Sequence, residues 1–464
     1  MGVFMIRNLI GDKAFYQKVL AVAIPMMLQQ MLGSFVSIVD NLIVGQVGDS
    51  AVAAIALVNR YFMISFFAII GFTSIAGVFI AQYAGAKNPS KMQETFRISF
   101  LTSGVLAIPF LIGGLFFSKE IVSFFSNQTS GPLVDEGIRV LRIITVSLIP
   151  TAISVNIANA MRAVYDTKKP LIASLVAIVV NVTLDFSFLY GWFFLPKWGV
   201  IGVAIATLMA RIVEMTILVT FLIRKDYQFK SKLSESFKVT GDLAFTMIKK
   251  GLPLTLNEIV WASGMSLLWK FYATRGESVL TSFAISSTTS DIFFSLFSGM
   301  AVATTIMVAH NLGANELDTA RKNAYQLIFF SAMMSFVFGG LIYLTSLALP
   351  LLYTKVTPSS LALSQHILQV MAFFFVIYML NVECFFILRA GGAIRQALIL
   401  DSGYMLFINL PTVAFFTYFT NLPVLTLYLI GQSVDIIKLI IAFSILRQEN
   451  WVNNLTVSPT LKEA

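Results

Sequence analysis

Residues 170–196 read PLIASLVAIVVNVTLDFSFLYGWFFLP, a stretch in which most side chains are apolar. An α-helix needs about 20 apolar residues to cross the hydrocarbon core of a bilayer. Asn181 and Asp185 interrupt the stretch, and because they are four residues apart they lie on one face of such a helix. The stretch therefore predicts a membrane-spanning helix that carries an amide and a carboxylate into the membrane.

The composition of the whole chain agrees with this prediction. Of its 464 residues, 57% are hydrophobic and only 12% are charged, and the mean hydropathy is +0.83. Soluble domains, by contrast, carry roughly a quarter charged residues. A helix satisfies its own backbone hydrogen bonds in lipid, whereas strands do so only in a closed barrel. We therefore predict an all-α membrane protein with twelve transmembrane helices, near residues 17–39, 51–81, 95–117, 137–160, 171–195, 199–223, 250–271, 280–309, 323–350, 364–388, 397–419 and 424–446.

Basic side chains collect in alternate loops between these spans. The largest group follows the sixth span, from Arg224 to Lys250, and few lie in the intervening loops. The positive-inside rule then predicts a multi-pass protein of the plasma membrane with both termini in the cytoplasm. The net charge of +9 is explained by loops that face anionic lipid, without nucleic-acid binding. The first apolar segment lacks an Ala-x-Ala-like cleavage site, so we expect it to be retained as the first helix.

The chain contains an internal duplication with an offset of 228 residues. The matched landmarks are AIPMMLQQ (23–30) with GLPLTLNE (251–258), Asn181 with Asn409 and, one residue out of register, MRAVYD (161–166) with LRAGGA (388–393). Because each half has an even number of spans, both insert in the same orientation, which predicts two parallel six-helix repeats. We divide the chain into an N-lobe of residues 1–223, a cytoplasmic linker of 224–249, a C-lobe of 250–447 and a cytoplasmic tail of 448–464.

The carboxylate of Asp185 suggests a function. A charged side chain at the centre of a membrane helix costs about 2.5–3.5 kcal/mol on insertion scales, so it normally faces a partner or water. Asp40 ends the first predicted span, and Thr207 lies in the sixth. With Asn181 these side chains offer only oxygen ligands, which suit a hard cation such as Na⁺ or a proton shared between carboxylates. The alternative is structural, with Asp185 bonded to a neighbouring helix and Asp40 capping a loop.

The sequence resembles the multidrug and toxic compound extrusion (MATE) family over essentially its whole length. The resemblance is carried by AIPMMLQQMLGSFVSIVDNLIVGQVG (23–48), AQYAGAKN (81–88), NVTLDF (181–186), GVAIATLMAR (202–211) and ILRAGG (387–392). It implies a cation site in the N-lobe, formed by Asp40, Asn181, Asp185 and Thr207, and alternating access of two lobes coupled to inward flow of Na⁺ or H⁺. It also implies that the first helix bends as ions bind. Pro25, which removes a backbone hydrogen bond, is the candidate hinge, and a static kink is the alternative.

The C-lobe differs from its twin at the positions of this site. Asp185 and Asp40 align with Val413 and Leu268, so we predict a single coupling site, in the N-lobe. The C-lobe has its own acid in the seventh helix, Glu258, which we interpret as a candidate for substrate binding or coupling.

Other acids in apolar helices have simpler interpretations. Asp435 lies three residues before Lys438, a spacing that predicts an ion pair within one helix, as does that of Arg211 and Glu214. Glu383 and Asp401 flank the loop RAGGAIRQ (389–396), and we interpret them as helix-end or packing acids whose roles stay open.

Two functions remain after the motif search. The chain has no G-x-x-x-x-G-K-[ST] motif, which argues against ATP as the energy source. Only two histidines, His310 and His366, and a single cysteine, Cys384, argue against an intramembrane metalloenzyme. The favoured function is a secondary antiporter that exports amphipathic organic cations in exchange for Na⁺ or H⁺. The alternative is a lipid or polysaccharide-precursor flippase of the same superfamily. We expect a monomer in the lipid bilayer, with no cofactor apart from the coupling ion and no nucleic-acid partner.

Overall fold

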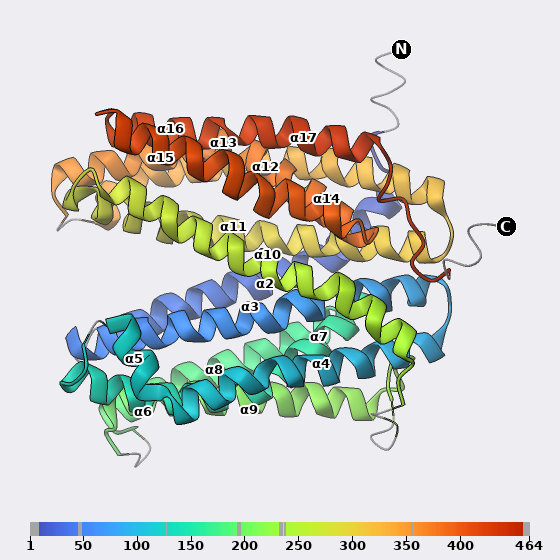
Figure 1. Cartoon of the computed structure of the whole chain (residues 1–464), viewed down its shortest axis with the longest axis horizontal. Coiled ribbons are helices and arrows are strands. Elements are labelled where there is room, and N and C mark those ends of the chain that lie inside the picture. The colour runs from blue at the N-terminus through green and yellow to red at the C-terminus, as the bar shows by residue number, and fades with distance from the viewer. Residues whose placement is uncertain are drawn as a thin grey trace. The chain divides into compact units, whose positions relative to one another are not determined.

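The computed structural model describes residues 9–44, 49–126, 128–192, 196–231, 235, 238–353 and 356–457. The side chains of residues 37–44, 49–52, 277, 278, 280 and 352 are outside this description. All the regular elements formed by the described residues are helices. Figure 1 shows that the helices of each half of the chain run side by side as a bundle.

Residues 28–256 form the first of two compact units. Its elements are the later part of α2 (Lys13–Val44), then α3 (Asp49–Gly85), α4 (Pro89–Phe116), α5 (Ser118–Ser126), α6 (Pro132–Val146), α7 (Leu148–Ala163), α8 (Lys168–Tyr190), α9 (Gly199–Arg224) and the beginning of α10 (Gly241–Ala273). Helices α6 and α7 together form the predicted fourth span, and Ser147 separates them.

The second compact unit consists of residues 257–464 together with the chain up to Met27. After the remainder of α10 it contains α11 (Glu277–Gly313), α12 (Leu317–Leu352), α13 (Pro358–Ala390), α14 (Ile394–Leu398), two π-helical segments η3 (Ile399–Gly403) and η4 (Met405–Asn409), α15 (Leu410–Phe419), α16 (Val424–Ser433) and α17 (Asp435–Arg447). The π-helical turns end just before Pro411, which cannot donate a backbone hydrogen bond.

The predicted fold class is confirmed. Among the described residues, eleven helical stretches are long and apolar enough to cross a membrane, and each corresponds to a predicted span. The twelfth predicted span corresponds to α10, which carries Lys249, Lys250 and Glu258 along its length. The chain is therefore an all-α membrane protein whose twelve helices form two repeats.

The duplication is also visible in the packing of individual residues. A Cβ atom added to Gly71 of α3 would lie 2.5 Å from the Cα atom of Thr255 in α10. A Cβ atom added to Gly299 of α11 would lie 2.8 Å from the Cα atom of Met27 in α2. The offset of 228 residues relates both glycines and both partners. Each crossing therefore joins a helix of one repeat to the first helix of the other, and a glycine permits it because the backbones can approach without a side chain between them.

Helices α2 and α10 each contribute to both compact units. The boundaries between the units fall after Met27 in α2 and after Leu256 in α10. Each boundary lies a few residues beyond an internal proline, Pro25 or Pro253. The lobes predicted from the chain order, 1–223 and 250–447, stay a prediction, and the compact units differ from them by the first parts of these two helices.

The segment that follows α9 is held against the loop between α7 and α8. Asp166 Oδ2 accepts a hydrogen bond from the Tyr227 hydroxyl at 2.7 Å and pairs with Lys169 Nζ at 2.7 Å and Lys225 Nζ at 3.2 Å. Burial acts to raise the pKa of the Asp166 carboxyl, but hydrogen bonds from Lys169, Tyr227 and Lys225 outweigh it and hold the pKa below its ordinary value. These charged and hydrogen-bonded contacts therefore hold the start of the linker against the loop between α7 and α8.

Candidate cation and substrate sites

Asn181 and Asp185, the polar pair within residues 170–196, are buried in α8. Asp185 has no exposed surface, and Asn181 is 6% exposed. Both side chains belong to the first repeat, in which α8 packs closely on α9, because a Cβ atom added to Gly202 of α9 would lie 2.9 Å from the ring of Phe188. The small side chain at this position lets the two helices approach, and so keeps the carboxylate away from lipid.

Of the other predicted members of the cation site, Thr207 has a described side chain and Asp40 does not. Thr207 of α9 is half-buried, and its hydroxyl donates a hydrogen bond to the Val203 carbonyl oxygen at 3.1 Å. Asp40 belongs to α2, but its side chain is outside the described residues. Asn181 Nδ2 is buried and has no hydrogen-bond partner among the described residues. A buried amide hydrogen without an acceptor is unfavourable by about 1–3 kcal/mol, so this position calls for a further polar group.

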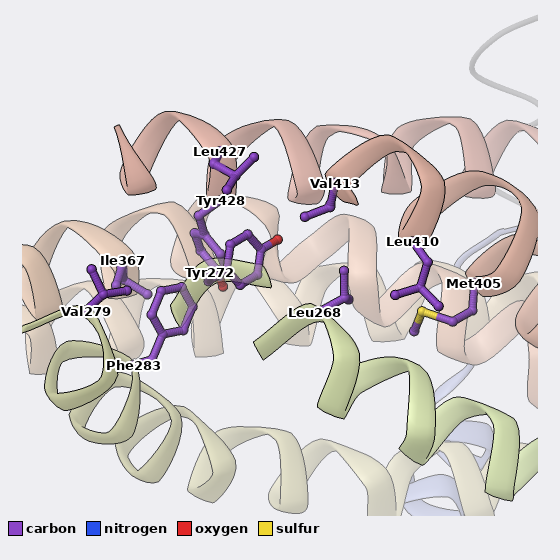
Figure 2. Packing of buried hydrophobic residues seen from close by; sticks show 10 residues of the cluster. All are labelled: Leu268, Tyr272, Val279, Phe283, Ile367, Met405, Leu410, Val413, Leu427 and Tyr428. Carbon is purple, nitrogen blue, oxygen red and sulfur yellow. The ribbon is translucent and has the colours of Figure 1, made fainter. Parts of the chain in front are cut away.

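The two positions of the second repeat that align with the carboxylates are apolar. Val413 and Leu268, which align with Asp185 and Asp40, both belong to one cluster of buried hydrophobic side chains. Figure 2 shows Leu268 of α10 and Val413 of α15 in this cluster, together with Tyr272 and Tyr428. The two repeats therefore share a fold here and differ in chemistry, in the direction predicted from the sequence.

One polar position of the second repeat could have been predicted from the sequence and was missed. The 228-residue offset that relates Asn181 to Asn409 also relates Thr207 to Asp435. Asp435 accepts a hydrogen bond from the Tyr404 hydroxyl at 2.8 Å, and Asn409 Nδ2 donates to the same hydroxyl oxygen at 3.3 Å. The second repeat thus keeps two polar side chains of the set, joined through a tyrosine.

Glu258 lies in a network of charged side chains. Arg389 Nη1, at the end of α13, donates to Glu258 Oε1 at 3.3 Å, and the two side chains are 5% and 19% exposed. The guanidinium group also lies over the rings of Phe385 and Phe386. Because the arginine compensates part of its charge, Glu258 attracts an external cation less than an unpaired carboxylate would.

The ion pair predicted between Asp435 and Lys438 is wrong. Lys438 Nζ lies 3.0 Å from Asp401 Oδ1, and Asp401 also accepts a hydrogen bond from Asn257 Nδ2 at 2.9 Å. Tertiary packing brings a carboxylate from another helix closer than the one on its own helix. The network thus holds three acids, Glu258, Asp401 and Asp435, and two bases, Arg389 and Lys438, so that full ionisation leaves one negative charge in excess. The pair predicted between Arg211 and Glu214 is confirmed, with Nη1 and Oε2 at 2.9 Å.

A related contact occurs in the first repeat. Arg162, which aligns with Arg389, donates from Nη2 to Gln29 Oε1 at 2.8 Å, and Gln29 Nε2 donates to Ser174 Oγ at 2.6 Å. In both repeats an arginine therefore reaches the opening helix just beyond its proline. The partner is a neutral amide in the first repeat and the carboxylate Glu258 in the second.

Two repeats of membrane-spanning helices with ionisable side chains buried among them define a polytopic membrane transporter. The comparisons with known proteins make this class specific. The chain belongs to the MatE family, whose model matches residues 25–187 and 253–419, one segment in each repeat. The resemblance to MATE transporters found in the sequence is thereby confirmed.

Individual relatives agree with the family. The chain is 26% identical over 378 residues to a probable multidrug resistance protein NorM of Rhodopseudomonas palustris, covering 80% of this chain and 77% of the relative. It is 23% identical over 362 residues to a probable NorM protein of Haemophilus ducreyi, covering 76% and 75%. A solved multidrug resistance MATE transporter of the MOP superfamily, described in an outward-facing conformation, superposes with a TM-score of 0.85 at 20% identity, covering 96% of this chain and 97% of that one.

Proposed function

We propose that this protein is a multidrug efflux transporter that exports amphipathic organic cations in exchange for Na⁺ or H⁺. The observation that carries the proposal is the difference between equivalent positions of the two repeats. Asp185 and Asn181 are buried in the first repeat, whereas Val413 takes the place of Asp185 within an apolar cluster of the second. An ionisable side chain buried in a membrane helix usually belongs to an ion or substrate pathway.

The coupling ion binds at Asp40, Asn181, Asp185 and Thr207 in this proposal. Carboxylate, amide and hydroxyl oxygens suit Na⁺, and two neighbouring carboxylates suit a shared proton. The asymmetry supports one such site in each chain, because the second repeat lacks both aligned carboxylates.

The substrate class follows from charge and from the relatives. The network around Glu258 has one acid more than it has bases, which favours a cationic substrate. The curated relatives are named multidrug resistance proteins, which supports drug-like substrates.

Helix α2 links the ion site to a conformational change. It carries both Asp40 and Pro25, and it passes from one compact unit to the other just beyond the proline. An ion bound at Asp40 therefore acts on a helix whose backbone hydrogen bonding Pro25 has already weakened. We propose Pro25 as the hinge of the transport cycle.

The remaining proposals concern the setting of the protein. The chain is an integral membrane protein, and we propose that it lies in the plasma membrane as a monomer with both termini in the cytoplasm. It would use an ion gradient and neither ATP nor a bound cofactor.

Efflux from proteoliposomes tests the function. A fluorescent organic cation should leave the vesicles under an imposed Na⁺ gradient or an imposed pH gradient, and the active gradient identifies the coupling ion. Asp185→Asn and Asp40→Asn should each abolish gradient-driven efflux while the protein stays folded, because the amide keeps the shape and removes the charge. Efflux at the wild-type rate by both variants would exclude the proposed ion site.

The repeat supplies a matched control. Asn181→Ala and Asn409→Ala remove the same side chain from equivalent positions, each 6% exposed. We expect efflux to be lost in Asn181→Ala and largely kept in Asn409→Ala. Equal defects would contradict the assignment of the coupling site to the first repeat alone.

A further inference from the structure

A second buried acid lies apart from both sites described above. Glu383 of α13 has no exposed surface. Ser331 of α12 donates a hydrogen bond to its Oε1 atom at 2.7 Å. The other carboxyl oxygen, Oε2, is buried and has no hydrogen-bond partner among the described residues. The hydroxyl of Thr304 in α11 is buried and lies beside this carboxyl, but no hydrogen bond of ordinary geometry joins the two groups. Thus Oε1 of the carboxyl accepts a hydrogen bond, and Oε2 accepts none of ordinary geometry from the described residues.

No basic side chain compensates the carboxyl among the described residues. Helices α11 and α12 present the hydroxyls of Thr304 and Ser331 to it. Its titratable neighbour on α13 is Cys384, which interacts in turn with Tyr325 of α12 and Lys438 of α17.

The charged groups of α17 have other partners. Lys438 is paired with Asp401, and Asp435 accepts a hydrogen bond from Tyr404. An ionised Glu383 would therefore be a buried charge without a counter-ion, and such a group is normally neutral.

The first repeat shows which chemistry this position accepts. Arg162 and Arg389 are aligned one residue out of register, and the same register aligns Asn156 of α7 with Glu383. Asn156 Nδ2 donates to Ser103 Oγ at 2.6 Å, and Ser103 is the repeat equivalent of Ser331. Asn156 is a neutral side chain that offers one acceptor and one donor group. A carboxyl group offers both only when it is protonated.

We infer that Glu383 is a proton-binding site of the second repeat, with its proton on Oε2 and available to Thr304 Oγ1. In this form the carboxyl offers one donor and one acceptor, as Asn156 does, although the serine is the acceptor in the first repeat and the donor in the second. The proton also gives Oε2 and Thr304 Oγ1 a hydrogen bond. The site is separate from the cluster around Asp185, since it belongs to the other repeat. Release of the proton requires α11, α12 and α13 to separate enough for water or a cation to replace it. This role in transport rests on the proposed antiport, whereas the binding of the proton does not.

Infrared spectroscopy of the purified full-length protein measures the proton directly. The carbonyl stretching band of a protonated carboxyl is distinct from that of a carboxylate, and it shifts when H₂O is replaced by D₂O. At neutral pH the wild type should show such a band, and Glu383→Gln should lose one carboxyl's share of it. Glu214→Gln is the matched control, because Glu214 also lies in a membrane helix but forms a salt bridge with Arg211. The band should be unchanged in this control.

A second measurement does not depend on a variant that folds. Dicyclohexylcarbodiimide reacts with protonated carboxyls in apolar surroundings, so mass spectrometry of labelled wild-type protein should find the adduct on the peptide that contains Glu383. A band that is unchanged in folded Glu383→Gln, or the absence of this adduct, would overturn the inference. Loss of the band on addition of Na⁺ alone at constant pH would also overturn it, because the carboxyl would then be a sodium ligand.

Transport then separates the two proposals. If Glu383 releases its proton during the transport cycle in addition to ion binding at the coupling site of the first repeat, Glu383→Gln should slow the efflux that an imposed pH gradient drives. If the wild type shows the band and the adduct but no gradient drives efflux, the proton site stands and the antiport proposal fails.

Discussion

The close helix crossings predict that Gly299 is needed for stability. In Gly299→Ala the new methyl group would lie 2.8 Å from the Cα atom of Met27, whereas ordinary van der Waals contact begins at 3.4 Å. The atom that must move belongs to the backbone of α2, so a change of rotamer cannot relieve the clash. Overpacking of this kind costs about 1–3 kcal/mol. Alanine is also the better helix former, by about 1 kcal/mol, which offsets part of the cost. We expect a net loss of up to about 2 kcal/mol in the free energy of unfolding.

Unfolding in detergent micelles, followed by circular dichroism, tests this value. Gly340→Ala in α12 is the matched control, because a Cβ atom there meets no atom within 4 Å. The control should be neutral or stabilised by up to about 1 kcal/mol. Gly71→Ala, at the equivalent crossing between α3 and α10, should be destabilised like Gly299→Ala. If Gly299→Ala and Gly340→Ala unfold at the same denaturant concentration, the close crossing does not exist as described.

Two further predictions concern charged side chains. Because the folded chain holds the pKa of Asp166 below its unfolded value, the stabilisation is present above the ordinary aspartate pKa of about 3.9 and is lost as the pH falls through the lower folded pKa. Near neutral pH the wild type should therefore be more stable than Asp166→Asn by about 1 kcal/mol. The melting temperatures of the two proteins should converge below about pH 4. A constant difference down to acidic pH would show that the charge of Asp166 is not responsible. Glu258→Gln should weaken resistance to cationic compounds more than to neutral ones in growth assays, since the substitution removes the excess negative charge of its network; equal effects would indicate a structural role.

Much of the fold could be predicted from local sequence. Long apolar stretches decide where membrane helices form, and Pro89 in the first turn suits the start of α4 after its cap residue Asn88. The offset of 228 residues indicated the two repeats. The points at which α2 and α10 pass between compact units could not be predicted, because they depend on packing between helices far apart in the chain.

Less of the candidate sites than of the fold could be predicted from the sequence. The burial of Asp185 and Asn181 follows from their place in an apolar helix. The pairing of Arg389 with Glu258 joins residues 131 positions apart, and no local spacing reveals it. The pairing of Lys438 was predicted wrongly for the same reason, since the rule for residues three apart considers only one helix. Glu383, first interpreted as a packing acid, acquires a specific chemistry only when its neighbours in α11 and α12 are known.

The π-helical turns of the second repeat explain how the two halves could diverge in length. Nineteen residues separate Arg162 from Asn181, and twenty separate Arg389 from Asn409. The segments η3 and η4 lie within this longer stretch, whereas its counterpart in the first repeat contains the regular helix α8. A π-helical turn accommodates an extra residue as a local bulge and leaves the helix beyond it in place. The extra residue of the second repeat is thus accommodated near Asp401, and Asn409 beyond it lies at the position equivalent to Asn181.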